Sequence, residues 1–75
     1  TIRYGLKQSC NVKITIYNSL GRKIIELINE RQDAGYHQAI WNGKNYLNQQ
    51  VSSGIYFYRL STENFTAIKR MVFIK

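Results

Sequence analysis

The sequence contains no proline, a single cysteine, a single histidine and only four acidic residues. A lone cysteine, Cys10, excludes an internal disulfide, and we expect it to be a small residue beside a turn. Metal clusters in proteins draw on several Cys and His ligands, whereas this chain offers Cys10 and His37 alone. We therefore expect neither a metal site nor any other cofactor.

The acidic residues are too few and too scattered to indicate catalysis. General acid–base chemistry needs two carboxylates that converge in a cleft, and three of these four lie in or beside expected loops. His37 has no nucleophile or orienting partner at a motif spacing. Gly43-Lys44 lacks the earlier glycine and the following Ser or Thr of a phosphate loop. We expect no enzymatic activity. The acids are Glu26, Glu30, Asp33 and Glu63.

Long apolar runs are also missing. No segment approaches the ~20 residues of a membrane-spanning helix, and no signal peptide opens the chain. A chain of 75 residues makes one small domain. Because Thr1 stands where an initiator methionine would, we expect residues 1–75 to be cut from a larger protein.

What the chain has instead is positive charge, with a net value of +7. Such a charge attracts nucleic acid, lipopolysaccharide or acidic protein. The cations are dispersed, however, without a block of five or six like charges, which is typical of a solvated exterior. The run Tyr56-Phe57-Tyr58-Arg59 could stack bases, but no RNP-type motif accompanies it, and alternate aromatic residues also suit a core. We do not expect nucleic acid as the partner, and salt-dependent binding would test that alternative.

Strand-forming residues dominate the apolar fraction of 44% and alternate with polar ones. This pattern predicts six or seven short antiparallel strands, separated by turns, and therefore an all-β sandwich. The segment 22–28 has apolar pairs at 24/25 and 27/28 that also suit a helix, although the turn at Gly21 favours a hairpin. We expect loops at 29–35 and 44–50, and a turn at Asn42-Gly43. The predicted strands are 2–7, 12–17, 22–28, 36–41, 54–60 and 68–75.

The last two predicted strands form a hairpin around a turn at 61–65. Tyr56 and its alternate neighbours face one side of the first strand, because side chains in a strand alternate. Trp41 is expected to anchor the core between two sheets. A last strand without a successor exposes at least part of its backbone ladder, so another chain can add a strand there.

Six motifs follow one another in register along the chain: Thr1-Ile2-Arg3-Tyr4-Gly5-Leu6, Val12 to Arg22, Ala34-Gly35-Tyr36-His37, Trp41-Asn42-Gly43-Lys44, Ser53 to Leu60 and Lys69 to Lys75. Their order resembles the C-terminal sorting domain of type IX secretion (Por secretion system) substrates. It is also similar to the related immunoglobulin-like domain of flagellar hook-capping proteins. The likeness covers essentially the whole chain.

The resemblance implies a seven-stranded immunoglobulin-like sandwich at the end of a larger exported protein. In that family the outer-membrane translocon machinery recognises the domain, and a surface peptidase commonly removes it. The cargo crosses the periplasm and outer membrane, and is released or joined to anionic lipopolysaccharide at the cell surface. Gly54 and Tyr56 match the family's Gly-x-Tyr element, and Lys69 and Lys75 match the basic residues of its terminal strand. With Arg70, these are the expected recognition residues of a monomeric domain.

A second hypothesis is a structural or adhesive immunoglobulin-like module of a surface or hook-capping-type protein. Hook-capping relatives share the fold without the sorting role, so the fold alone does not decide between the two. Position separates them. A sorting domain ends its parent protein, whereas a structural module is followed by further sequence or lies between other domains.

Overall fold

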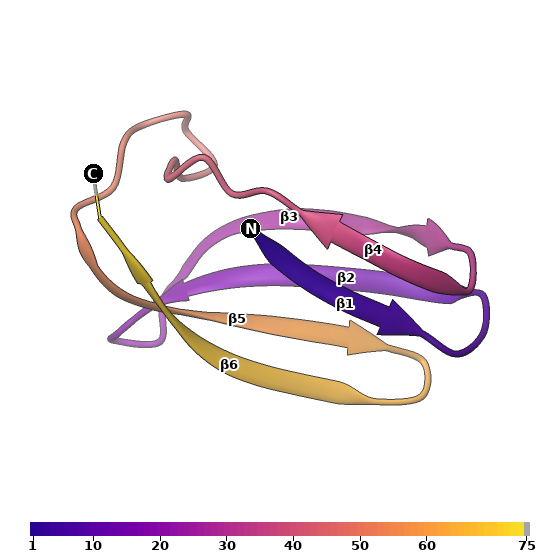
Figure 1. The fold of residues 1–75 in the computed structure, drawn as a ribbon. Helices are drawn as coiled ribbons and strands as arrows, with labels where there is room; N and C mark the ends of the chain where they lie inside the picture. The colour runs from indigo at the N-terminus through magenta and orange to yellow at the C-terminus, as the bar shows by residue number, and fades with distance from the viewer. Residues whose placement is uncertain (75) are drawn as a thin grey trace.

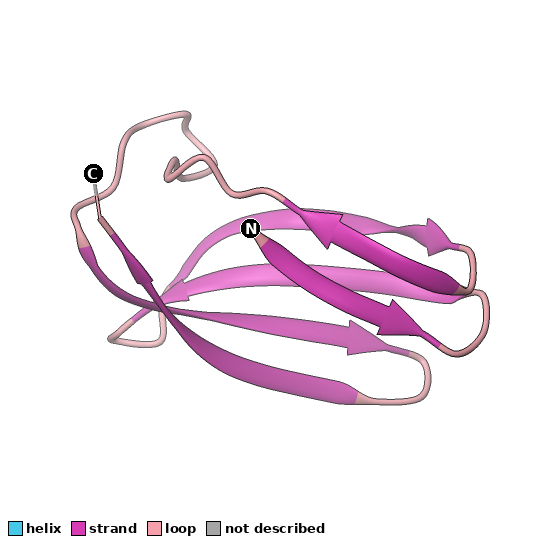
Figure 2. Ribbon diagram, viewed as in Figure 1, coloured by secondary structure: helices cyan, strands magenta, loops and turns pink. Residues whose placement is uncertain are grey.

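The computed structural model describes residues 1–74 as two antiparallel β-sheets stacked on each other (Figure 1). One sheet has two strands, β1 and β4, and the other has four, in the order β3-β2-β5-β6. Figure 2 shows strands joined by loops, with no helix in the described residues. The strands are β1 (Ile2–Leu6), β2 (Cys10–Asn18), β3 (Lys23–Gln32), β4 (Gly35–Ala39), β5 (Gly54–Thr62) and β6 (Thr66–Phe73).

The core is built from side chains that alternate along the strands. On β1, Ile2, Tyr4 and Leu6 are buried while the residues between them are exposed. On β2, Ile14 and Ile16 have no solvent exposure at all. Since successive side chains of a strand point to opposite faces, this alternation places one face of each sheet against the other. The predicted all-β sandwich is therefore confirmed.

The strand β3 explains why segment 22–28 has a helix-like spacing. The pairing of β2 with β3 slips twice, between Ile14 and Thr15 and between Ile16 and Tyr17. Each slip leaves one extra residue on β3, Leu27 and Ile24 respectively. An extra residue at a β-bulge lets two consecutive side chains approach the same face. The apolar pairs 24/25 and 27/28 are thus all half-buried. The hairpin prediction for this segment is confirmed.

The strand count is six, not the seven that the resemblance implies, because residues 40–53 form a loop. Asn45 Oδ1 accepts hydrogen bonds from the backbone N–H groups of Leu47 (3.0 Å) and Gln49 (3.0 Å). Such side-chain bonds to the backbone compete with ladder pairing. One isolated bridge, Lys44 with Gln50, is the only strand-like pairing in the described part of this loop.

Two expectations about local structure were wrong. The loop predicted at 29–35 is shorter, because β3 continues to Gln32 with its polar side chains facing water, and β4 begins at Gly35. The strand predicted at 36–41 ends at Ala39, so Trp41 lies in the following loop. Cys10, in contrast, is a buried free thiol at the first position of β2, directly after a turn, as expected.

Candidate functional site

The strand β6 forms one edge of the four-stranded sheet, at the bottom of Figure 1. Its eight residues, Thr66–Phe73, pair in unbroken register with Ser61 to Gly54 of β5. Among the described residues β5 is its only strand partner. An edge strand presents a row of backbone N–H and C=O groups to one side, and these can pair with another chain. The expectation of an exposed ladder on the last strand is therefore confirmed.

The two faces of β6 differ in chemistry. Met71 and Phe73 lie opposite Tyr56 and Gly54 of β5 and pack against the core. The alternate side chains point away from the core, and large apolar ones among them are exposed. Ile68 is 65% and Val72 is 66% exposed. Isolated exposed apolar residues are ordinary, but two in line on an open edge mark a surface that favours contact with another molecule. In the sequence, Ile68 and Val72 are marked as surface residues only by their alternation with the core-facing residues of β6.

Two cations stand at the middle of β6. Lys69 lies opposite Tyr58 and Arg70 opposite Phe57, and both side chains are exposed. Since adjacent residues point to opposite faces, the two charges flank the strand on either side. Neither takes part in an ion pair within residues 1–74, whereas Glu26 engages Lys13 and Lys23. The sequence prediction located these cations on the open strand correctly.

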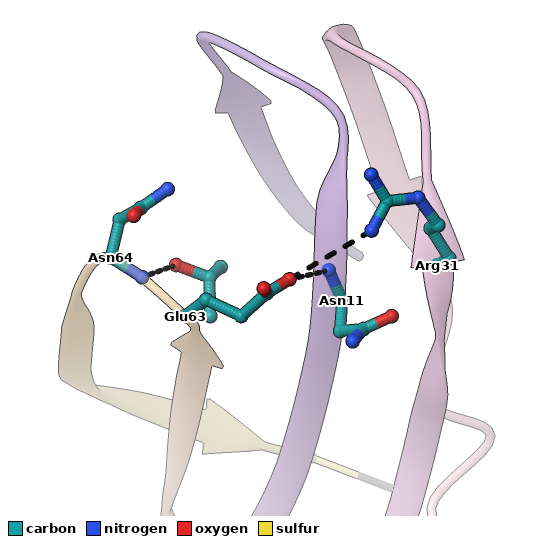
Figure 3. Close-up of polar contacts among 5 residues, drawn as sticks. Asn11, Arg31, Glu63 and Asn64 are labelled. Atoms are coloured by element: carbon teal, nitrogen blue, oxygen red, sulfur yellow. Dashed lines mark hydrogen bonds and ion pairs between the residues drawn. The ribbon is translucent and has the colours of Figure 1, made fainter.

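Glu63 is also used locally, at the turn between β5 and β6 (Figure 3). Its Oε1 atom accepts a hydrogen bond from the backbone N–H of Asn11 (2.8 Å) and lies 3.9 Å from Arg31 Nη1. At the same turn, Thr62 Oγ1 accepts from the N–H of Asn64 at 3.1 Å. Glu63 thus ties this turn to β2 and β3, and it does not converge with Glu26. Within the described residues no group of Cys, His, Asp and Glu is placed to hold a metal ion.

Tyr56 belongs to an aromatic cluster that closes one end of the sandwich. Its ring lies 5.1 Å from that of Trp41 and 6.3 Å from that of Phe73, both in edge-on geometry or close to it. Its hydroxyl donates to the carbonyl of Ser52 at 2.7 Å, and Trp41 Nε1 donates to the carbonyl of Lys44 at 2.9 Å. Edge-to-face packing and satisfied polar tips are typical of structural aromatic residues. Trp41 therefore anchors the core from the loop, and Tyr56 from the strand.

The two glycines at this end have different functions. Gly54 starts β5 with φ +157°, and a Cβ there would meet no atom within 4 Å. Close approach therefore gives no reason for glycine at this position, and only the backbone conformation of Gly54 favours it. Gly43, in contrast, has φ +77°, and a Cβ there would lie 2.2 Å from Phe73 Cζ. Gly43 is the close-approach glycine, and sequence reasoning, which noted only its turn signal, missed this contact.

The remaining sheet edges are less suited to pairing. The β3 edge carries two bulges, and the backbone N–H of Tyr46 already donates to the carbonyl of Ile24 at 3.1 Å. Bulges and covering loops are two devices by which proteins block an edge. β1 and β4 have five residues each. β6 is thus the longest uninterrupted edge among the described strands.

Comparison with known families gives the assignment. The family model named CHU_C, a type IX secretion signal domain, matches residues 1–75 and so covers the whole chain. The chain belongs to this family. Searches of the curated proteins and of the solved structures found no match.

Membership of the type IX secretion signal domain family identifies the role of the chain as a secretion signal. It implies export across the outer membrane to the cell surface or the medium, and interaction with the type IX secretion machinery. The family is one of signals and not of enzymes. No helix in residues 1–74 has the length and apolar character needed to cross a membrane.

The structure places four of the five expected recognition residues on β6 or on the end of β5 that pairs with it. Gly54 and Tyr56 pair with the end of the strand, at Phe73 and Met71. Lys69 and Arg70 occupy its centre. Lys75 lies outside the described residues.

Proposed function

We propose that this domain directs a larger exported protein through the type IX outer-membrane translocon, and that the machinery recognises it at the edge of β6. In this account Lys69, Arg70 and Lys75 are the charged label, while Gly54 and Tyr56 hold the strand in place. The observation that carries the proposal is an unbroken eight-residue edge strand with unpaired cations at its centre. A surface peptidase then separates the domain from its cargo. The domain acts as a monomer.

The physical support comes from strand addition. An extended segment of a receptor can continue the sheet beyond β6, so that backbone hydrogen bonds supply affinity and side chains supply specificity. The aromatic cluster of Tyr56, Trp41 and Phe73 holds one end of β6, and the Glu63 turn holds the other. A strand fixed at both ends is preorganised, which lowers the conformational entropy that binding must overcome.

A reporter fusion tests the sorting role. The domain is fused to the carboxyl end of a periplasmic reporter in a bacterium with type IX secretion, and the reporter is measured in the periplasm and the medium. We expect export in the wild-type strain and periplasmic retention in a strain without the translocon. Equal export by both strains, or retention in both, would refute the proposed function. A fusion that lacks residues 69–75 should also be retained.

A further inference from the structure

The chemistry of β6 constrains the segment that pairs with it. We propose that the partner is an extended acidic segment in which two consecutive acidic residues face Lys69 and Arg70, with apolar residues on either side. This inference rests on the proposed function, because it names the chemistry of the partner at the same edge. It concerns a protein segment and not a lipid or a nucleic acid, since it requires a backbone that can extend a sheet.

The order of the partner's residues follows from strand geometry. A strand added beyond β6 places each of its residues directly opposite one β6 residue, with both side chains on the same face. The exposed apolar side chains of Ile68 and Val72 therefore each meet one residue. Cross-strand pairs of β-branched or aromatic residues are stabilising, so apolar residues fit these two positions best. On β5, Ile55 lies opposite Val72 and is itself 45% exposed, so the exposed apolar surface extends from β6 onto β5.

At the two positions of the partner that face Lys69 and Arg70, acidic residues are the most favourable. Lys69 and Arg70 are exposed, and no acid within residues 1–74 pairs with them. Opposite charges directly across a strand pair are stabilising, whereas like charges are destabilising. Read along β6 from Ile68 to Val72, the partner is thus apolar, acidic, acidic, apolar and apolar. The fourth position is apolar because Met71 is half-buried against the core.

The same cations argue against a second copy of this chain as the partner. In an antiparallel pairing of two β6 strands centred on a two-fold axis, Lys69 would face Lys69 or Arg70 would face Arg70. Like charges directly opposite one another destabilise the pair, and charged residues on edge strands commonly prevent such self-association. An acidic segment, in contrast, uses these charges for attraction. Lys69 and Arg70 therefore favour an acidic segment as the partner and disfavour a second copy of this chain.

Synthetic peptides test this pattern directly. A fluorescein-labelled peptide with the central order Val-Glu-Asp-Leu-Val is titrated with the 75-residue domain by fluorescence anisotropy, and the reversed order is tested because an added strand can run either way. A control peptide has the same composition with its acids at the two ends. Another carries N-methyl groups along its backbone, which remove the hydrogen-bond donors. We expect the ordered peptide, in one direction, to bind about tenfold more tightly than either control.

Charge reversal supplies a second, independent readout. The variant Lys69→Glu/Arg70→Glu should lose the acidic peptide and instead bind a peptide with lysines at the two central positions. Lys7→Glu/Arg22→Glu is the matched control, because it changes the net charge equally at exposed positions outside β6. This control should keep its preference for the ordered acidic peptide. Melting curves of both variants confirm that they fold.

The outcomes are separable. Equal binding of the ordered and rearranged peptides would mean attraction by net charge alone, and would overturn the inference. Absence of binding by every peptide, or NMR shifts that map to the β3 edge instead of β6, would overturn it as well. None of these results alters the reporter fusion experiment, which tests the sorting role without reference to the partner's sequence.

Discussion

At the scale of single residues, contacts at the closed end of the sandwich hold β6 in position. Gly43 is buried against the ring of Phe73, and Gln50 Nε2 donates to the Gly43 carbonyl at 3.0 Å. The loop and the last strand thus approach each other more closely than any residue with a side chain would allow. The sequence does not predict this contact, because the Asn42-Gly43 dipeptide indicates a turn but not which side chain packs against it.

Replacing Gly43 with alanine should therefore lower the stability of the domain by more than the backbone strain at its positive φ alone explains. We expect Gly43→Ala to lower the free energy of unfolding by about 2–4 kcal/mol, since conformational strain adds to overlap with Phe73. Gly21→Ala is the control, because Gly21 has φ +82° but no atom within 4 Å of its Cβ position. It should cost about 1 kcal/mol. Urea denaturation of both variants measures the difference, and equal losses would contradict the packing argument.

Tyr4 makes the stability of the domain depend on pH in the alkaline range. Burial raises the pKa of Tyr4 above its ordinary value of 10.0, Glu30 raises it further, and the hydrogen bond to Gln32 opposes the shift. Because the unfolded chain then ionises first, the contribution of Tyr4 to stability is complete below pH 10.0 and is lost as pH rises through the higher folded pKa. Tyr4→Phe should lose less stability over this range than the wild type.

The control for this comparison is Tyr36→Phe, since Tyr36 is 95% exposed. Unfolding free energies of the three proteins are measured by denaturant titration from neutral pH to above pH 10.0. We expect Tyr36→Phe to follow the wild-type profile. Parallel profiles for all three proteins would show that Tyr4 does not carry the effect.

At the scale of elements, alternation predicted the strands well and their irregularities poorly. β1 follows the period of two expected for a half-buried strand over its whole length, and β2 follows it as far as Ile14, after which Thr15 is buried as well. β3 departs from that period at two bulges, where consecutive apolar residues share the buried side. A bulge depends on its partner strand, so no local pattern separates it from a helical spacing. The loop at 40–53 likewise depends on Asx bonds that compete with pairing.

The two faces of β6 should respond differently to substitution. Ile68→Ser and Val72→Ser are expected to change the free energy of unfolding by no more than about 0.5 kcal/mol, because both side chains are exposed. Phe73→Ala should cost roughly 2 kcal/mol, because its ring packs against Trp41 at 5.1 Å. Thermal and urea unfolding measure all three variants. A large loss at Ile68 or Val72 would mean that this face of the strand is covered and not available to a partner.

At the scale of the whole molecule, β6 is the longest edge with unbroken pairing among the described strands. The domain measures 35 × 20 × 18 Å, and a domain this small buries only about 60% of its unfolded surface. The β3 edge is bulged and in part covered by the loop, whereas β6 is regular and carries only charge as protection. The edge position of β6 agrees with the exposed backbone ladder predicted for this strand of the hairpin. The protection of β3 was not predictable, because it comes from residues 40–53 folding back onto it.

If charge alone protects β6, its removal should promote self-association. The wild type is expected to sediment as a monomer, and Lys69→Ser/Arg70→Ser to form dimers or larger species as concentration rises. Lys7→Ser/Arg22→Ser, which removes the same charge elsewhere, should remain monomeric. Analytical ultracentrifugation at matched salt concentrations distinguishes these outcomes. Association of the control variant as well would assign the effect to net charge rather than to the edge.

The central claim is that the edge of β6 is what the secretion machinery recognises. Its most direct measurement is the secreted fraction of the reporter fusion carrying Lys69→Glu/Arg70→Glu, compared with Lys7→Glu/Arg22→Glu, after melting curves show that both domains are folded. We expect the β6 variant to accumulate in the periplasm and the control to be exported like the wild type. Normal export of the folded β6 variant would contradict the account.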